Sequence, residues 1–109
     1  MALSDRRCEA CGPDTAALSE AATRSMLEQL PQWTRVHEDR VIQRDFTFDS
    51  YWAGLGFVNA VAWIAQQEKH HPDIELGYKK ARVRFTTHAA KGLTENDFIC
   101  AAKVDRLLA

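Results

Sequence analysis

The sequence predicts an α+β domain in which a four-stranded antiparallel sheet is covered on one face by helices. Two pairs of short segments with alternating apolar residues predict two hairpins, and three segments with helical spacing of apolar residues surround them. The elements follow the order helix, strand, strand, helix, strand, strand, helix. Because 109 residues are too few for two domains, we expect one domain over residues 18–109 and a loosely attached leader over residues 1–17.

The first predicted helix begins after Ser19, whose hydroxyl can cap it, and ends before Pro31. Its apolar stripe contains Ala22, Met26, Leu27 and Leu30. Two strands follow over residues 33–37 and 40–48, with a turn at Glu38-Asp39 between them. Apolar residues alternate with polar ones in the second strand, which predicts one buried face formed by Ile42, Phe46 and Phe48.

The longest helix is expected from about Ser50 to about His70, with Asp49 as its cap and Pro72 beyond its end. Apolar residues lie nearly all round this helix. One stripe, suited to covering the sheet, contains Phe57, Val61 and Ile64. The other contains Trp52, Gly56, Asn59, Trp63, Gln66 and His70. Because this second stripe needs its own partner, we expect a homo-oligomer.

The second hairpin and the last helix complete the pattern. Residues 74–78 and 81–86 alternate in polarity around Lys79-Lys80, so they form two strands with one apolar face. Thr94 opens a helix that continues to about Leu108, and Asp97 three residues later makes an approximate capping box. The inward side of this helix is expected to carry Phe98, Ala101, Ala102 and Leu108.

Composition excludes several classes of protein. Lys and Arg number 14 and Asp and Glu number 15, so the net charge of −1 gives no overall positive field for nucleic acid. No secretory signal is visible, and the most apolar stretch is too short to span a bilayer. Three cysteines are too few for a disulfide scaffold. We therefore expect a cytoplasmic protein with no nucleic-acid or membrane partner.

Histidines are the main candidates for chemistry, because an imidazole can give and take a proton near neutral pH. His70 and His71 lie at the end of the long helix, and His88 follows a strand, whereas His37 beside a polar turn is expected to be merely exposed. Adjacent histidines on a helix point about 100° apart, so they are poorly placed to share a metal ion. Asp97 could orient a histidine or serve only as a helix cap.

Cys8-x-x-Cys11 leaves a different possibility open, since this spacing occurs in zinc sites and in redox pairs. No second cysteine pair follows it, and it lies in the leader. We therefore expect no metal site, and a zinc module remains the weakest alternative.

The spacing of His70-His71-Pro72, Tyr78, His88 and Asp97 resembles the signature of the pterin-4a-carbinolamine dehydratase family. Two short sequence motifs strengthen the resemblance: Thr86-Thr87-His88 and Gly92-Leu93-Thr94-Glu95-Asn96-Asp97. The resemblance extends over about residues 18–108. The resemblance implies the fold predicted above. It also implies dehydration of 4a-hydroxytetrahydrobiopterin to quinonoid dihydrobiopterin and water, in support of tetrahydrobiopterin recycling and without a cofactor.

The resemblance implies His70 and His88 as the catalytic proton-transfer pair and His71 as a catalytic-site group that binds and orients the pterin. It implies that Asp97 holds or polarises a histidine. Further pterin contacts fall on Asp73, Tyr78 and Thr87. Where the family usually has Glu, one turn before the first histidine, this chain has the supporting residue Gln66, whose amide can hydrogen-bond but cannot act as a carboxylate base.

The resemblance also implies a dimer or a dimer-of-dimers tetramer, and a metabolic link to phenylalanine hydroxylase. An alternative function is a non-catalytic, partner-binding protein on the same fold, because relatives in the family can act as dimerisation cofactors of a transcription factor. Measured dehydratase activity distinguishes the two functions.

Overall fold

The computed structural model describes residues 2–109 and confirms the predicted order of helices and strands. The elements are α1 (Glu20–Leu27), β1 (Thr34–Val36), β2 (Val41–Thr47), α2 (Tyr51–Glu68), β3 (Asp73–Leu76), β4 (Lys80–Phe85) and α3 (Glu95–Arg106). Two short 3-10 helices, η1 (Leu3–Asp5) and η2 (His88–Ala90), were not predicted from the sequence pattern.

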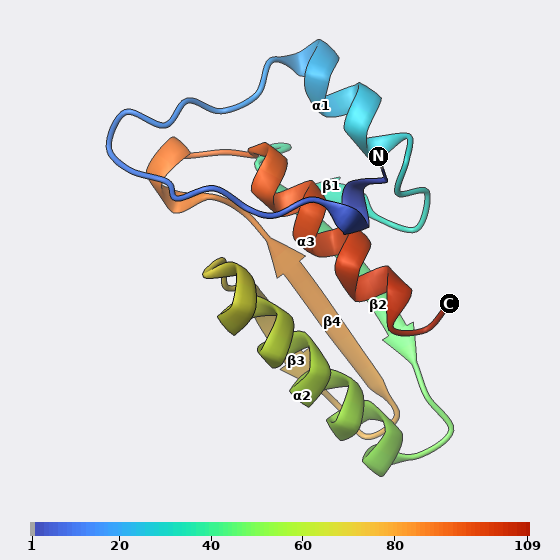
Figure 1. Cartoon of the computed structure of the whole chain (residues 1–109). Coiled ribbons are helices and arrows are strands. Elements are labelled where there is room, and N and C mark those ends of the chain that lie inside the picture. Colours follow the sequence, from blue (N-terminus) through green and yellow to red (C-terminus); the bar gives the residue numbers. More distant parts are fainter. Residues whose placement is uncertain (1) are drawn as a thin grey trace.

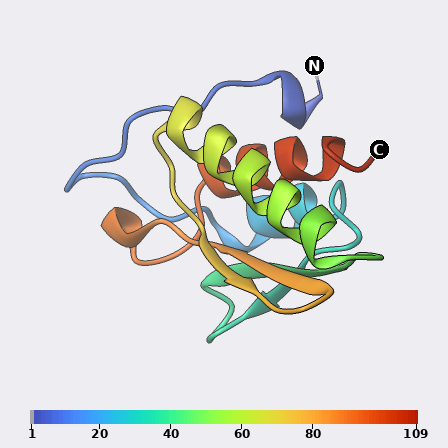
Figure 2. The same ribbon diagram turned by 90° about the horizontal axis from the view of Figure 1, so that it is seen from below.

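The four strands form one antiparallel sheet in the order β1-β2-β4-β3. The central pair, β2 and β4, is in register from Ile42 opposite Phe85 to Thr47 opposite Lys80. Helices lie on one face of this sheet (Figures 1 and 2), so the predicted fold class is confirmed. Between the layers lies a core that includes Trp33, Ile42, Phe46, Phe57, Val61, Val83, Phe85, Phe98, Ile99 and Val104.

The opposite face of the sheet is polar. Arg82 Nε donates to Asp45 Oδ1 at 2.7 Å, and Arg84 Nε donates to Gln43 Oε1 at 2.7 Å. The hydrogen bond from Arg82 lowers the pKa of Asp45 below its ordinary value. Because this ion pair is exposed, it adds little to stability. The outer face of the sheet is therefore polar and partly exposed, whereas the face under the helices is buried.

The ends of α2 and α3 differ from the predicted ones. Ser50 caps α2, since its Oγ accepts from Ala53 N–H at 3.1 Å, so the assignment of the cap to Asp49 was wrong. The helix ends at Lys69, which adopts a left-handed conformation (φ 54°, ψ 39°) three residues before Pro72. His70 therefore lies just outside the helix. Leu108 was predicted to face the core, but it lies beyond the end of α3 and is half exposed.

The second stripe of α2 is left largely uncovered by residues 2–109. Trp52 is 80% exposed and Trp63 is 65% exposed, whereas Phe57 and Val61 are buried against the sheet. This division between a covered and an uncovered stripe agrees with the sequence pattern. None of the helices formed by residues 2–109 combines the length and apolar character that a membrane-crossing helix requires.

Residues 2–17 were expected to be a loosely attached leader. The first part of this segment runs along α3 towards the end of α2, and the rest loops outward and returns to α1 (Figure 1); Met1 lies outside the described residues. Leu3 is buried in the core. Asn96 holds the backbone of Glu9 at both ends: Glu9 N–H donates to Asn96 Oδ1 at 3.0 Å, and Asn96 Nδ2 donates to Glu9 O at 2.7 Å. Local periodicity gives no sign of these contacts, because they join residues 87 positions apart.

Candidate active site

Asp97, in the first turn of α3, is fully buried and is surrounded by hydrogen-bond donors. Its Oδ2 accepts from Thr94 N–H at 2.9 Å, as a capping residue does, and from Thr87 Oγ1 at 2.8 Å. Thr94 Oγ1 lies 2.8 Å from Thr87 Oγ1. Because the one hydroxyl proton of Thr87 goes to Asp97, Thr94 donates to Thr87. These contacts fix the orientation of the carboxylate and leave Oδ1 for another donor.

His70 is that other partner, with its Nε2 2.6 Å from Asp97 Oδ1. The imidazole lies parallel to the ring of Phe85, with 6.0 Å between ring centroids and 7° between planes. Only 10% of the His70 side chain is exposed. A carboxylate only accepts, so the neutral imidazole carries its proton on Nε2 and its lone pair on Nδ1. The sequence left open whether Asp97 orients a histidine or caps a helix, and the structure shows both contacts.

The other two candidate histidines are exposed at the same end of the sheet. His71 follows His70 directly, and His88 begins η2 just beyond β4 (Figure 1). Thr87 N–H donates to Gly92 O at 3.0 Å and closes the η2 loop, so His88 sits beside the residue that holds Asp97. The end of α2, the end of β4 and the start of α3 thus converge on one site. His37 is exposed in the β1–β2 turn, with φ 51°.

The remaining predicted site residues differ in their exposure and in their distance from the histidines. Gln66 is exposed on the last turn of α2, and Asp73 is exposed at the start of β3. The Thr87 hydroxyl is buried and bonded to Asp97, so it acts on the carboxylate. Tyr78, 72% exposed, lies in the β3–β4 turn at the opposite end of β4 from His88. Within one chain, the structure does not bring Tyr78 together with His70.

Sequence reasoning missed two parts of this site. Phe85 was assigned only to the apolar face of its strand, yet it also supports the imidazole of His70. Thr94 was assigned only as a helix cap, yet its hydroxyl also contacts Thr87. Neither residue carries a local signal for these contacts, since each depends on how β4, α2 and α3 meet.

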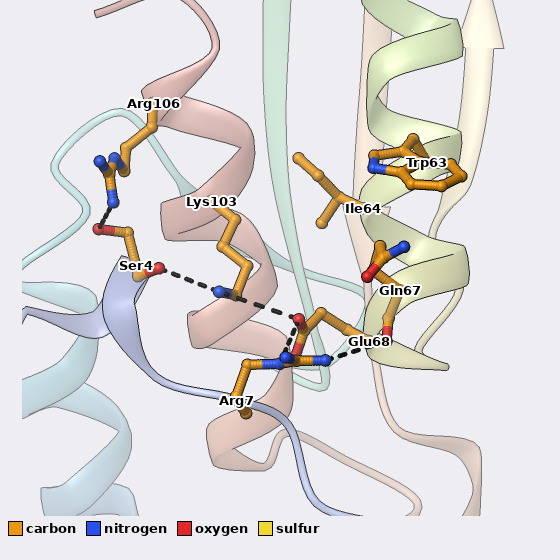
Figure 3. A pocket seen from close by; sticks show the side chains of 8 residues that line it. All are labelled: Ser4, Arg7, Trp63, Ile64, Gln67, Glu68, Lys103 and Arg106. Atoms are coloured by element: carbon orange, nitrogen blue, oxygen red, sulfur yellow. Dashed lines mark hydrogen bonds and ion pairs between the residues drawn. The ribbon is translucent and has the colours of Figure 1, made fainter.

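A second feature of the surface is a cleft of about 410 Å³ between α2, α3 and the N-terminal segment (Figure 3). Its lining residues are Ser4, Arg7, Trp63, Ile64, Gln67, Glu68, Lys103 and Arg106. The Glu68 carboxylate, 5% exposed, pairs with Arg7 Nε at 2.9 Å and lies 3.9 Å from Lys103 Nζ. None of the candidate histidines lines this cleft. The Glu68 carboxylate is therefore paired with Arg7 in this cleft and not with His70. We take the site around the histidines as the better candidate for chemistry.

The cysteines do not form the arrangement that a zinc module needs. Cys8 Sγ lies 3.4 Å from Cys100 Sγ, while Cys11 Sγ lies 3.2 Å from Asn96 Nδ2. Over residues 2–109, no three His, Cys, Asp or Glu side chains are grouped so that they could hold a metal ion.

Comparisons with known proteins give one consistent family. A family profile described as pterin 4 alpha carbinolamine dehydratase matches residues 16–107. A Legionella pneumophila (strain Corby) protein, provisionally named a pterin-4-alpha-carbinolamine dehydratase, is 50% identical over 107 residues, which cover 97% of this chain and 95% of that protein. A relative of the same name from Nitrosomonas eutropha is 49% identical over 106 residues, covering 97% of this chain and 93% of the relative.

Two solved structures are also similar. A transcriptional coactivator/pterin dehydratase from Brucella melitensis has a TM-score of 0.81 at 29% identity, covering 85% of this chain and 99% of that one. A pterin dehydratase-like protein, described as a RuBisCO assembly factor in the alpha-carboxysome, has a TM-score of 0.62 at 25% identity, covering 70% and 88%. The same fold is thus found in proteins that are described with different roles.

Proposed function

The chain belongs to the pterin-4α-carbinolamine dehydratase family, and on this premise we propose that it dehydrates 4a-hydroxytetrahydrobiopterin to quinonoid dihydrobiopterin and water. The observation that carries the proposal is the buried contact between His70 Nε2 and Asp97 Oδ1 at 2.6 Å. In this role the protein supports tetrahydrobiopterin recycling. It acts after aromatic amino acid hydroxylases such as phenylalanine hydroxylase, which form the carbinolamine.

The proposed reaction needs one proton delivered and one removed. An acid protonates the 4a hydroxyl, the lone pair of N5 expels it as water, and a base then takes the proton from N5. The sum is one water released and no net change in protons. Imidazoles suit both steps because they titrate near neutral pH. We assign the two proton transfers to His70 and His88, and the binding and orientation of the pterin to His71.

Asp97 is a positioning residue in this proposal. By accepting from Nε2–H it keeps the lone pair of neutral His70 on Nδ1, the atom that is left to exchange a proton with the substrate. Thr87 and Thr94 hold the carboxylate in turn. Gln66 and Asp73, both exposed, complete the pterin contacts. We assign Tyr78 to a pterin bound by a neighbouring subunit, because a six-residue strand such as β4 extends about 20 Å.

Purified protein is expected to dehydrate chemically generated 4a-hydroxytetrahydrobiopterin faster than the spontaneous reaction, as measured by stopped-flow absorbance. Gln66→Glu restores the carboxylate usual in the family and is expected to raise kcat by no more than about tenfold, because an exposed charge gains little from its surroundings. Gln67→Glu is the matched control: the neighbouring amide lines the cleft of Figure 3, and its replacement should leave kcat unchanged. A wild-type rate equal to the spontaneous rate contradicts the proposal.

A partner-binding function is the second candidate, and the exposed indoles of Trp52 and Trp63 favour it. Two large apolar side chains on one helix form a surface of the kind found at protein–protein interfaces. Absence of dehydratase activity, together with a partner that co-purifies in stoichiometric amount, supports this function over catalysis.

We also propose that the exposed stripe of α2 joins copies of the chain into a dimer or a dimer-of-dimers tetramer. Light scattering at micromolar concentration is expected to give a mass of two or four times the 12.3 kDa of one chain. The double variant Trp52→Ser, Trp63→Ser is expected to lower that mass, because it removes the two largest exposed side chains of the stripe. Leu107→Ser, which removes an exposed apolar side chain outside α2, is the control. A strictly monomeric wild type overturns this prediction.

A further inference from the structure

Two thiols meet where the N-terminal segment crosses α3. Cys8 Sγ lies 3.4 Å from Cys100 Sγ, although the two residues are 92 positions apart in the chain. Cys8 is half-buried, Cys100 is fully buried in α3, and both are free thiols. The function proposed above uses neither of them.

We propose that Cys8 and Cys100 are a redox modification site, which closes to a reversible disulfide fastening residues 2–17 to α3. A disulfide has sulfurs about 2.05 Å apart, so the two atoms, now 3.4 Å apart, have to approach by only about 1.4 Å. Rotation about the side-chain bonds of Cys8 supplies a movement of this size.

The backbone around Cys8 is already held in place for this bond. Cys8 N–H donates to Glu68 Oε1 at 2.8 Å, at the end of α2. The next residue, Glu9, is held on both sides of its backbone by the Asn96 amide, one turn before Cys100 on α3. Three hydrogen bonds to side chains of α2 and α3 therefore keep Cys8 opposite Cys100. Because the backbone is already fixed, little chain entropy is lost when the disulfide forms.

The two thiols have unequal roles in the reaction. Hydrogen bonding to Cys8, together with burial, raises the pKa of Cys100 well above the ordinary value of a thiol. Cys100 therefore stays protonated and shielded from dissolved oxidants. Cys8 is only half-buried and is the more accessible member of the pair, so it is the sulfur that meets a hydroperoxide first.

With hydrogen peroxide as the oxidant, the reaction proceeds in two balanced steps. The sulfur of Cys8 attacks one peroxide oxygen, the O–O bond breaks, and a sulfenic acid and one water result. The sulfur of Cys100 then displaces the hydroxyl group from Cys8, and its thiol proton leaves with that hydroxyl as a second water. Two thiols and one peroxide give one disulfide and two waters. A dithiol reductant reverses the change.

Cys11 is the competing thiol. It is exposed, and its sulfur lies 3.2 Å from Asn96 Nδ2 and 3.8 Å from Glu9 O. These contacts hold the Cys11 side chain against the Asn96 amide, whereas Cys100 contacts the sulfur of Cys8. Cys11→Ser is therefore a matched control that removes a nearby thiol and leaves the proposed pair intact.

The test treats the full chain with one equivalent of hydrogen peroxide, followed by peptide mapping without reduction and by thermal unfolding. We expect a loss of about 2 Da, for the two hydrogens removed, and a cross-linked peptide containing Cys8 and Cys100. We expect the midpoint of unfolding to rise by about 10 °C and to return after dithiothreitol, because the bond closes a loop of nearly the whole chain.

Three variants make the outcome decisive. Cys11→Ser should retain the cross-link and the thermal shift, whereas Cys100→Ala should lose both. If Cys100→Ala folds poorly, the half-buried Cys8→Ser serves the same purpose. A Cys8–Cys11 bond, a disulfide between chains, or sulfinic acid at Cys8 without any cross-link overturns the proposal.

Discussion

Replacing His70 by alanine is expected to lower kcat for dehydration by at least about 100-fold, because the variant loses a general acid–base group. The imidazole is almost fully buried, with Asp97 at one nitrogen and the ring of Phe85 against its face. Its loss also leaves Asp97 Oδ1 without a donor, which costs about 1–3 kcal/mol of stability. Stopped-flow rates and thermal unfolding measure the two effects.

A second replacement separates catalysis from folding. His70→Gln keeps a side-chain N–H that can donate to Asp97, so its stability should fall less than that of His70→Ala, but it cannot transfer a proton. His37→Asn is the matched histidine control, since His37 is exposed and Asn tolerates its φ of 51°. A His70→Gln variant with wild-type kcat, or a His37→Asn variant that loses activity to the same extent, contradicts the assigned role of His70.

Asp97→Asn is expected to reduce kcat by about 100-fold or more while the chain stays folded, because it changes the tautomer of His70. The amide oxygen can still accept from Thr94 N–H and Thr87 Oγ1. The amide nitrogen must then donate to His70 Nε2, so the imidazole proton moves to Nδ1. We expect a stability loss of about 1–2 kcal/mol, since charge-assisted hydrogen bonds become neutral ones.

Nitrogen-15 NMR of the imidazole distinguishes the two tautomers directly. Asp105→Asn is the control on the same helix: Asp105 accepts from Trp33 Nε1 at 2.9 Å and from Arg44 Nη1 at 2.6 Å, but it has no contact with His70. It is expected to lose a similar amount of stability and to keep its activity. The positioning role fails if Asp97→Asn retains kcat, or if His70 keeps its proton on Nε2.

Much of the fold follows from local patterns in the sequence. Alternating polarity in β2 and β4 placed Ile42 and Phe85 on one buried face, and the two faces of α2 separated as their spacing predicts. Helix ends were less predictable. Two adjacent polar residues, Asp49 and Ser50, can each cap a helix, and only the backbone geometry selects Ser50. Lys69 ends α2 in a conformation that its residue type does not signal.

The site was only partly predictable. The spacing of the histidines and Asp97 identified the residues, but the contact between His70 and Asp97 depends on α2 and α3 packing side by side on the sheet. For the same reason, Phe85 and Thr94 were not recognised as parts of the site. Tyr78 was included in the site because of its spacing from the histidines along the chain. It lies in the β3–β4 turn, at the opposite end of β4 from His88, so spacing in sequence does not by itself bring it near His70.

The contacts of residues 2–17 also determine when this segment can reach its native position during synthesis. Their binding partners are made much later: Glu68 is 60 residues downstream of Cys8, and Lys103 is 99 residues downstream of Ser4. The segment cannot dock until α3 has left the ribosome, so it waits without its partners while the sheet and α2 are made. The part of the domain that the ribosome makes before the others is therefore among the last to reach its native place.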